Sequence, residues 1–429
     1  MDLHQFELAK WRCQFKQLTG LTWLDLHQTQ VTDAGLKHLE GLTKLKKLSV
    51  GQTKVSDTGL EHLKGLTRLE KLDLRFTQVT NAGLEHLKGL TSLIELDLYG
   101  TQVTDAGLEH LKGLTRLERL SVRHTQVNGS GLAHLNGLTR LKKLDFYGSQ
   151  LDDAGLEHLR GLTSVEALNF GSTQVTGVGL GHLKSLQNLK TLTLSHVTND
   201  AGLEHVKGLK RLEELSLYQA GQVTGDGLEH LTGMTSLKRL DISGMLVTNA
   251  DLQHLKRLSS LESLSLGSLA AFGNTKVSDS GMAHLKELTS LKSLNLINTG
   301  VGDAGLEHLK GLTSLEDLWL WGTRVTGDGL KHLKGLTKLE ILWLSGTRVT
   351  DADLDHLAGM TSLKELNLDS SLVTDAGLVH LEGLANLGKL MLRHTPVTRA
   401  GVNDLNTKLP KCNIVHGGRV AVWAPREGE

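Results

Sequence analysis

The sequence is poor in the residues that most enzymes and secreted scaffolds depend on. Aromatic side chains make up 3% of its 429 residues, and there are only three prolines and two cysteines. Cys13 and Cys412 lie near opposite ends of the chain, so the sequence offers no disulfide framework and favours a reducing compartment. With so few rings, the core has to be built from aliphatic side chains.

The sequence also lacks an excess of either charge and any long hydrophobic run. Lysine plus arginine and aspartate plus glutamate both number 47, so no overall field attracts nucleic acid or an anionic membrane. No apolar run approaches the roughly 18–20 residues that span a bilayer. The opening "MDLHQFELAKWRCQFKQL" has no hydrophobic stretch typical of a signal peptide. We therefore expect a cytoplasmic protein that binds neither nucleic acid nor a membrane.

What the sequence does contain is a strict internal repeat. The phrase "GLEHLKGLT" occurs from Gly59, Gly83 and Gly107, at intervals of 24 residues, and again from Gly305. The full unit is close to LxxLxLxxTxVTDAGLEHLKGLTx. Sixteen units begin at Leu21, Leu45, Leu69, Leu93, Leu117, Leu141, Val165, Leu189, Leu212, Leu237, Leu261, Leu291, Leu315, Leu339, Leu363 and Leu387. A period of this kind predicts a repeat architecture.

The repeat resembles the leucine-rich repeat family, whose units pair a short strand with a helix. Its "VTDAGL" phrase is similar to the cysteine-containing branch of that family, in a 24-residue form of bacterial type. Thr29, Thr77 and Thr101 stand where that branch has cysteine or asparagine. The resemblance implies a protein-binding role.

Each part of the unit has a physical interpretation. In "LDLRF" Leu72 and Leu74 face one way while the polar residues between them face the other, as in a strand. Thr80 or Asn81 is placed to cap the following helix, and Gly89 to end it in the left-handed conformation. We expect an α/β fold: a right-handed solenoid, or horseshoe, with a parallel sheet on the concave face and short helices on the convex face.

The ends of such a solenoid need covers. The sequence predicts a capping helix over residues 1–20, repeats over 21–408, and a cap and tail over 409–429. Trp11 and Trp423 are interpreted as cap residues, and 413–415 as a short strand.

One outward column of strand positions changes character in "LEDLWLWGT". The column carries aspartate, asparagine, serine or threonine in most repeats, but tryptophan at Trp319 and Trp343, with Trp321 alongside. Exposed tryptophans on adjacent strands are typical of contact surfaces. The predicted partner-binding residues are Trp319, Trp321, Trp343, Ile297, Ile341 and Asp317.

Several occupants of this surface are open at this stage. The favoured one is another protein; the others are a second copy of the chain, the "VAVW" tail of the same chain, or the other indoles themselves. A different class of function is carbohydrate binding, with indoles stacking on sugar rings and Asn295, Asn367 and Asp317 bonding hydroxyls.

A second predicted surface lies nearer the amino end. Arginine and tyrosine recur there at the outward position after the strand, and a six-residue insertion after Leu266 adds a ring. Its residues are Arg75, Tyr99, Arg123, Tyr147 and Phe272.

Signals for chemistry are weak. Asp73 and Asp97 fall on adjacent strands but have Arg75 beside them, which neutralises the pair. Histidine recurs at one helix position from His38 to His380, yet neighbouring helices would hold the rings about 8–10 Å apart, which is too far for a shared metal ion. We expect no enzyme activity, no metal and no cofactor.

Overall fold

The computed structural model describes residues 20–194, 196–218, 220–267 and 276–417. The chain divides into two compact units, unit 1 over Met1–Leu212 and unit 2 over Glu213–Glu429. The predicted capping helix with Trp11, the insertion with Phe272 and the tail with Trp423 lie outside the described residues.

The described strands of unit 1 form a parallel sheet to which each repeat contributes one strand. Equivalent positions pair across neighbouring strands, for example Leu72 with Leu96. The strands are β1 (Trp23–Asp25), β2 (Lys47–Ser49), β3 (Lys71–Asp73), β4 (Glu95–Asp97), β5 (Arg119–Ser121), β6 (Lys143–Asp145), β7 (Ala167–Asn169) and β8 (Thr191–Thr193).

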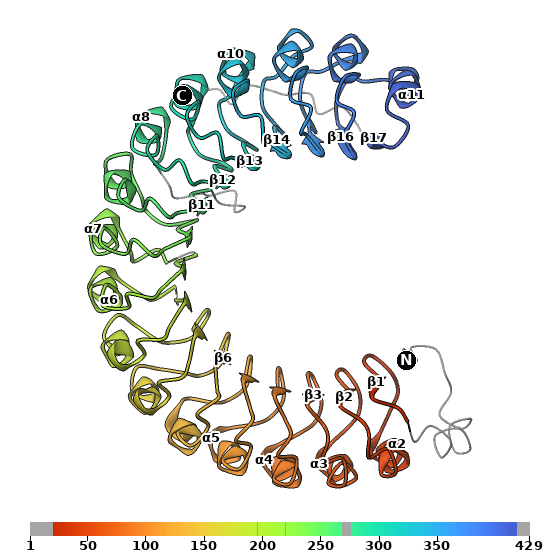
Figure 1. Cartoon of the computed structure of the whole chain (residues 1–429), viewed down its shortest axis with the longest axis vertical. Coiled ribbons are helices and arrows are strands. Elements are labelled where there is room, and N and C mark those ends of the chain that lie inside the picture. The colour runs from red at the N-terminus through yellow and green to blue at the C-terminus, as the bar shows by residue number, and fades with distance from the viewer. Residues whose placement is uncertain (1–19, 195, 219, 268–275, 418–429) are drawn as a thin grey trace. The chain divides into compact units, whose positions relative to one another are not determined.

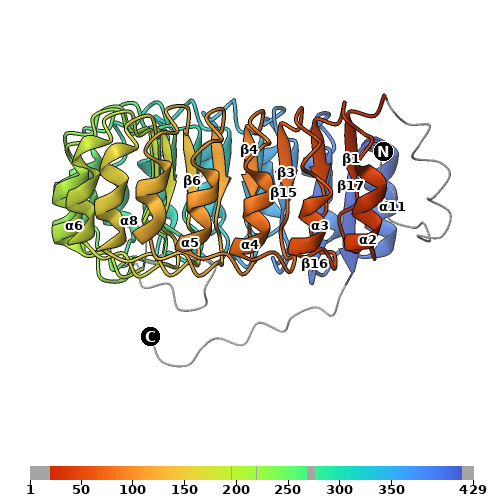
Figure 2. The ribbon, with the colours of Figure 1, turned by 90° about the horizontal axis from the view of Figure 1, so that it is seen from below.

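Short helical turns of unit 1 lie on the other side of each repeat from its strand (Figure 1). They are α2 (Asp33–Leu36), η3 (Lys37–Leu39), α3 (Asp57–Glu61), α4 (Asn81–Leu84), η4 (Glu85–Leu87), α5 (Asp105–Leu108), η5 (Glu109–Leu111), η6 (Ser130–Leu135), η7 (Gly155–Gly161), η8 (Gly179–Ser185) and α6 (Asp200–Val206). Figure 2 shows α2, α3, α4 and α5 side by side in chain order.

Unit 2 repeats the arrangement. Its strands are β9 (Glu214–Ser216), β10 (Arg239–Asp241), β11 (Ser263–Ser265), β12 (Ser293–Asn295), β13 (Asp317–Trp319), β14 (Ile341–Trp343), β15 (Glu365–Asn367), β16 (Lys389–Arg393) and β17 (Asn413–Gly417). The strand expected over 413–415 is present as β17, which pairs in parallel with β16.

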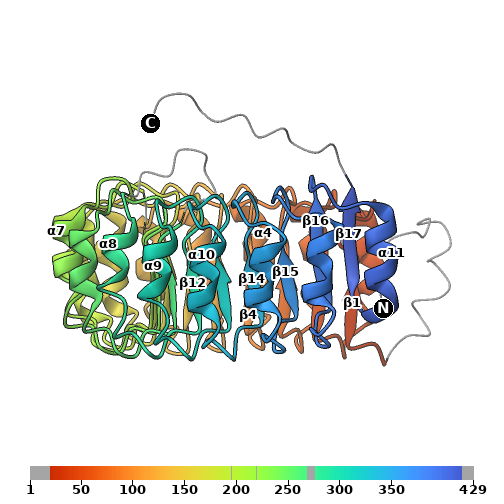
Figure 3. The same ribbon diagram turned by 90° about the horizontal axis from the view of Figure 1, so that it is seen from above.

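The helical turns of unit 2 again lie opposite the strands. They are α7 (Gly225–Glu229), η9 (Ala250–Leu255), α8 (Asp279–Met282), α9 (Asp303–Glu307), α10 (Gly327–Leu330), η10 (Lys331–Leu333), η11 (Ala352–Leu357), η12 (Asp375–Leu381) and α11 (Arg399–Lys408). Figure 3 shows α8, α9 and α10 in a row.

Leucines from the strand, the helical turn and the loops fill the space between the two layers. Leu72, Leu74, Leu84 and Leu87 of one repeat are at most 1% exposed, as their spacing predicts. A three-residue strand cannot bury its apolar side alone, so each repeat depends on its neighbours for a closed core. The predicted solenoid of stacked strand-and-helix repeats is confirmed.

A carboxylate ties many repeats to the next one. Asp57 accepts hydrogen bonds from the backbone N–H of Thr80 at 2.7 Å and from its hydroxyl at 2.6 Å. In unit 2 Asp303 accepts the same pair from Thr326, at 2.8 and 2.6 Å. The glycine of "VTDAGL" makes room for this contact, because a Cβ at Gly83 would come within 2.3 Å of the Asp57 carboxylate. The Asp of one repeat and the Gly of the next therefore act together to form this contact between repeats.

The threonine that replaces cysteine in the resembling branch bonds within its own repeat. The hydroxyl of Thr101 donates to the backbone carbonyl of Leu98 at 2.7 Å, and Thr323 does the same to Leu320. These hydroxyls are nearly buried and satisfied, which explains a polar residue in a leucine core.

The helix ends differ partly from expectation. Thr80 caps α4 as predicted, accepting from the N–H of Ala82 at 3.3 Å. The left-handed end predicted at Gly89 is wrong, because Gly89 is not among the residues with positive φ. Instead α4 tightens into η4, and the N–H of Leu90 bonds the carbonyl of Leu87 at 2.9 Å. The tighter turn uses the last carbonyls without a left-handed residue.

Candidate functional site

The residues that face away from the helices form what we call the open face of each unit. In each repeat with a three-residue strand they are the first and third residues of the strand and the residue two positions after the strand, which we number as positions one, three and five. On β13 these are Asp317, Trp319 and Trp321. Their register partners on β14 are Ile341 opposite Asp317 and Trp343 opposite Trp319. We call the set of Asp317, Trp319, Trp321, Ile341 and Trp343 the Trp patch. The structure thus brings together five of the six residues predicted as the main contact surface.

Ile297, the sixth predicted residue, contributes little surface. It is only 4% exposed, although it occupies an outward position after β12. The backbone of Gly267 in the preceding repeat lies so close that a Cβ there would be 2.3 Å from the Ile297 nitrogen. The backbone of Ile297 is thus closely packed against the preceding repeat.

The three tryptophans of the patch are less exposed than their outward positions predict. Trp321 is 37% exposed, whereas Trp319 and Trp343 are half-buried. The indole N–H of Trp343 donates to the Glu365 carboxylate at 3.0 Å, which directs that ring toward β15. Trp319 and Trp343, both described, make no ring-to-ring contact with each other. Mutual stacking therefore does not account for them.

The third open-face position has a structural task that tryptophan cannot perform. Where it holds aspartate or asparagine, the side-chain oxygen accepts the N–H of the residue two further on and so holds the turn after the strand. Asn295 does this for Ile297 and Asn367 for Asp369, both at 2.9 Å. In unit 1 the same bond is made by Asp25, Asp73, Asp97, Asp145 and Asn169. An indole has no acceptor to offer, so Trp319 and Trp343 give up a bond worth about 1 kcal/mol.

Asp317 is the unusual carboxylate of this surface. Its side-chain oxygens make no hydrogen bond or ion pair with any described residue. Burial raises the pKa of Asp317, and the nearby charges of Glu316 and Glu340 raise it further. By contrast Glu95, at the same strand position in unit 1, pairs with Lys71 at 2.6 Å and Arg119 at 3.1 Å.

Two of the three polar residues predicted for carbohydrate binding, Asn295 and Asn367, are engaged within the chain, whereas the Asp317 carboxylate is not. The amide oxygens of Asn295 and Asn367 hold the turns described above, and the Asn295 amide group donates to Ser265 at 2.9 Å. Asn367 is also only 7% exposed. These bonds, together with the burial of Asn367, reduce what the two amides can offer a sugar hydroxyl.

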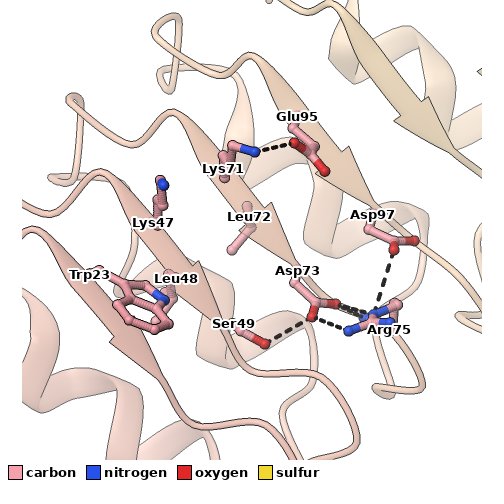
Figure 4. Close-up of a pocket in the computed structure, with 10 residues that line it drawn as sticks. All are labelled: Trp23, Lys47, Leu48, Ser49, Lys71, Leu72, Asp73, Arg75, Glu95 and Asp97. Carbon is pink, nitrogen blue, oxygen red and sulfur yellow. Dashed lines mark hydrogen bonds and ion pairs between the residues drawn. The ribbon is translucent and has the colours of Figure 1, made fainter. Parts of the chain in front are cut away.

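Unit 1 carries a cavity of about 330 Å³ on its open face (Figure 4). Arg75 lies between two carboxylates there, bonding Asp73 at 2.9 Å and lying 3.5 Å from Asp97. Burial would raise the pKa of Asp73, but hydrogen bonds from Arg75 bring it below its usual value. Burial raises the pKa of Asp97, and the charge of Asp73 adds to this. The arrangement is an ion-pair network around one guanidinium.

Trp23 forms one end of this cavity and was missed by sequence reasoning. It occupies the first open-face position of β1 and is 51% exposed. The signal was present, since a tryptophan at an outward strand position is the feature that identified Trp319.

Beside the cavity, rings from successive repeats form what we call the aromatic ladder: Phe76, Tyr99, His124 and Tyr147, with Arg123 among them. Ring centroids are 4.3 Å apart from Phe76 to Tyr99, 5.3 Å from Tyr99 to His124, and 5.4 Å from His124 to Tyr147. The Arg123 guanidinium lies 5.2 Å from the Tyr99 centroid and 5.0 Å from that of Tyr147. Four of the five residues predicted for the second surface, Arg75, Tyr99, Arg123 and Tyr147, thus lie on neighbouring repeats.

Two members of the aromatic ladder have an unfavourable backbone conformation. Phe76 and His124 have φ of 52° and 48°, where bulky side chains are rare. Gly100 and Gly148 occupy the same position in neighbouring repeats at φ of 67° and 69° without that cost.

The histidine column stands on the helical side and is half-exposed or exposed rather than buried. His62 contacts the Glu40 carboxylate of the preceding repeat at 2.6 Å. Among the described residues no three His, Cys, Asp or Glu side chains are grouped to hold a metal ion. Within the same residues, no helix has the length and apolar character needed to cross a bilayer.

Comparison with known proteins identifies the repeat. A family model described as "Leucine Rich repeat" matches residues 66–88 and 287–310. No curated protein sequence matches the chain.

Solved structures share the fold at low identity. A leucine-rich repeat protein of Leptospira interrogans is 20% identical with a TM-score of 0.62, covering 95% of this chain and 98% of that one. An internalin of Listeria monocytogenes is 23% identical with a TM-score of 0.52, covering 84% and 92%. The leucine-rich repeat ectodomain of an Arabidopsis thaliana receptor kinase is 18% identical with a TM-score of 0.51, covering 93% of this chain and 50% of that one. Two of the sixteen units thus match the leucine-rich repeat model, and the chain has the fold of these leucine-rich repeat structures.

Proposed function

We propose that this chain is a protein-recognition scaffold and that the Trp patch of unit 2 is the centre of contact with its partner. One observation carries the proposal. Two strands in register, β13 and β14, both place tryptophan where aspartate or asparagine would hold the turn. Both positions forgo the turn bond. The indole N–H of Trp343 bonds Glu365 within the chain, whereas the indole N–H of Trp319 has no partner among the described residues, which supports a role for this surface outside the repeat.

The composition of the patch supports a protein partner. Partly exposed tryptophans are the residue type most enriched among interface hot spots, and Ile341 extends the apolar surface beside them. The plant receptor ectodomain with this fold was solved in complex with Casparian strip integrity factor 2. Carbohydrate binding has less support, because Asn295 and Asn367 are committed to backbone and side-chain bonds.

The chain offers a substitution that removes the indoles and keeps the fold. Asn295 and Asn367 show that asparagine suits the third open-face position on both sides of the patch. The test variant therefore carries Trp319→Asn, Trp343→Asn and Trp321→Ser, the last copying Ser345 on the next strand. A control variant carries Phe76→Gln in unit 1, copying Gln52 one repeat earlier.

The experiment is an affinity capture from cell lysate with quantitative mass spectrometry, on the wild type and both variants. We expect a partner retained by the wild type and the Phe76→Gln control and lost by the triple variant. Equal capture by all three would refute the proposal. Sedimentation of the same proteins without lysate separates the homo-oligomer alternative, in which the wild type and the Phe76→Gln control would self-associate and the triple variant would not.

A further inference from the structure

The Trp patch has an electrostatic character that narrows its partner. The open-face positions of β13, β14 and β15 include three carboxylates, Asp317, Glu365 and Asp369, and no lysine or arginine. Glu365 is engaged with Trp343 and with Lys389, and Asp369 accepts the N–H of Arg393. Asp317 alone of the three has no partner among the described residues.

Acidic side chains elsewhere at the first open-face position all have cations. Glu95 has Lys71 and Arg119, Glu214 has Arg239, and Glu365 has Lys389. The strand partners of Asp317 are Ser293 and Ile341, which carry no charge. A half-buried carboxylate without a counter-charge is costly, so its presence beside the indoles calls for an explanation.

Unit 1 contains the arrangement that unit 2 lacks. There the Arg123 guanidinium lies between the rings of Tyr99 and Tyr147, with the Asp145 carboxylate 3.8 Å away. Rings and a carboxylate hold a cation supplied by the chain itself. In the Trp patch the rings and the carboxylate are present and the cation is not.

We infer that the Trp patch receives a cationic side chain, an arginine or lysine of a protein partner, with its charge between Asp317 and the indole of Trp319. Asp317 and Trp319 are two residues apart on one strand and face the same way. A planar guanidinium can stack on an indole while its N–H groups bond a carboxylate, so arginine fits best. This inference rests on the proposed function, because it assigns the chemistry of the same contact.

The test uses a random library of twelve-residue peptides displayed on phage. The library is selected on the immobilised full chain and depleted on the Trp319→Asn/Trp343→Asn variant. Selected peptides are synthesised with and without replacement of each arginine by citrulline and each lysine by norleucine. Their affinities for the wild type and for Asp317→Asn are measured by isothermal titration calorimetry.

We expect the selected peptides to share an arginine or lysine whose replacement weakens binding about tenfold or more, since a desolvated charge pair is lost. Asp317→Asn should weaken the same peptides by a similar factor and leave the citrulline forms unchanged. The Asp317→Asn protein should fold normally, because asparagine removes an unpaired charge, so lost binding cannot be ascribed to unfolding.

The outcomes separate this inference from the function beneath it. Peptides that need the tryptophans but share no cation, and bind Asp317→Asn equally, would overturn the inference and leave the proposed function standing. If no selected peptide depends on the tryptophans, both fail.

Discussion

The open faces of the two units stand on the same frame, by which we mean the strands, the helical turns and the links from Asp to Thr between repeats. They differ in whether their carboxylates are paired with cations of the chain. In unit 1, every acid of the cavity and the ladder has its cation within the chain, with Arg75 between Asp73 and Asp97 and Arg123 near Asp145. In unit 2 the Trp patch leaves Asp317 without one. The carboxylates of the first surface are neutralised by the chain itself, whereas the Asp317 carboxylate of the second is available to a cation from a partner.

Both faces also depart from what the local backbone favours. Unit 1 holds Phe76 and His124 at positive φ, where glycine serves neighbouring repeats. Unit 2 holds Trp319 and Trp343 where asparagine would bond the turn. In a repeat protein such departures can be measured against adjacent copies, which gives each variant a built-in reference.

The largest expected effect tests whether the frame is the same in both units. Asp57→Ala and Asp303→Ala each remove a carboxylate that accepts two hydrogen bonds from the next repeat. We expect each to lower stability by about 2–3 kcal/mol, because a backbone N–H loses its partner as well. Urea unfolding followed by circular dichroism measures this. A loss in one unit only would show that the frames are not equivalent.

The next effect concerns the ion-pair network of unit 1. Arg75→Gln should destabilise by about 1 kcal/mol at pH 7, since these side chains are partly exposed and screened. Arg75 lowers the pKa of Asp73, so its contribution is present above the unfolded pKa near 3.8 and is lost as pH falls through the lower folded pKa. Melting curves of the two proteins should therefore converge on acidification below about pH 4. Lys47→Gln, at an open-face lysine without an ion pair among described residues, should melt like the wild type at both pH values.

A smaller effect tests the hydrogen bond that tryptophan gives up. Trp319→Asn and Trp319→Ala both remove the indole, but only asparagine can accept the N–H of residue 321. We expect the asparagine variant to be more stable than the alanine variant by about 1 kcal/mol, measured by thermal unfolding. Equal stabilities would mean that the third position has no role in the turn.

The smallest expected effect is the change in stability when a single carboxylate at the first open-face position is neutralised, and we expect it to have opposite signs in the two units. Because the pKa of Asp317 is raised, its charged form is disfavoured in the folded state, and stability is lost as pH rises from the unfolded pKa through the folded one. Asp317→Asn should therefore raise stability at pH 7 by about 0.5 kcal/mol after allowance for exposure.

Glu95→Gln provides the contrast at the same strand position. Burial would raise the pKa of Glu95, but Lys71 and Arg119 bring it below its usual value, so this substitution should lower stability at pH 7. Calorimetric melting at pH 7 checks both signs. A loss at both sites would show that Asp317 has a stabilising partner.

The sequence predicted the frame and the direction of each strand side chain well, because one period repeated sixteen times leaves little choice. It also placed the Trp patch, since Trp319 and Trp343 differ from a column of small polar residues. It could not predict the burial of Ile297, because strand spacing places that residue outward and does not show how closely neighbouring repeats pack around it. It missed Trp23, although this tryptophan also occupies an outward strand position, one that holds lysine in the next two repeats. The pairing of Arg123 with Tyr99 and Tyr147 depends on side-chain rotamers, and these are not encoded in spacing.

The link from Asp57 to Thr80 has a consequence for how such a chain can change in length. If residues 69–92 were deleted, Asp57 would meet Thr104, another threonine with the same two donors, and the strands on either side would join leucine to leucine. Loss or duplication of this repeat would therefore preserve both the hydrogen bonds between Asp and Thr and the pairing of leucines across the sheet. Such an event would change the order of side chains along the open face. The open face can therefore differ between related chains whose strands and helical turns are packed in the same way.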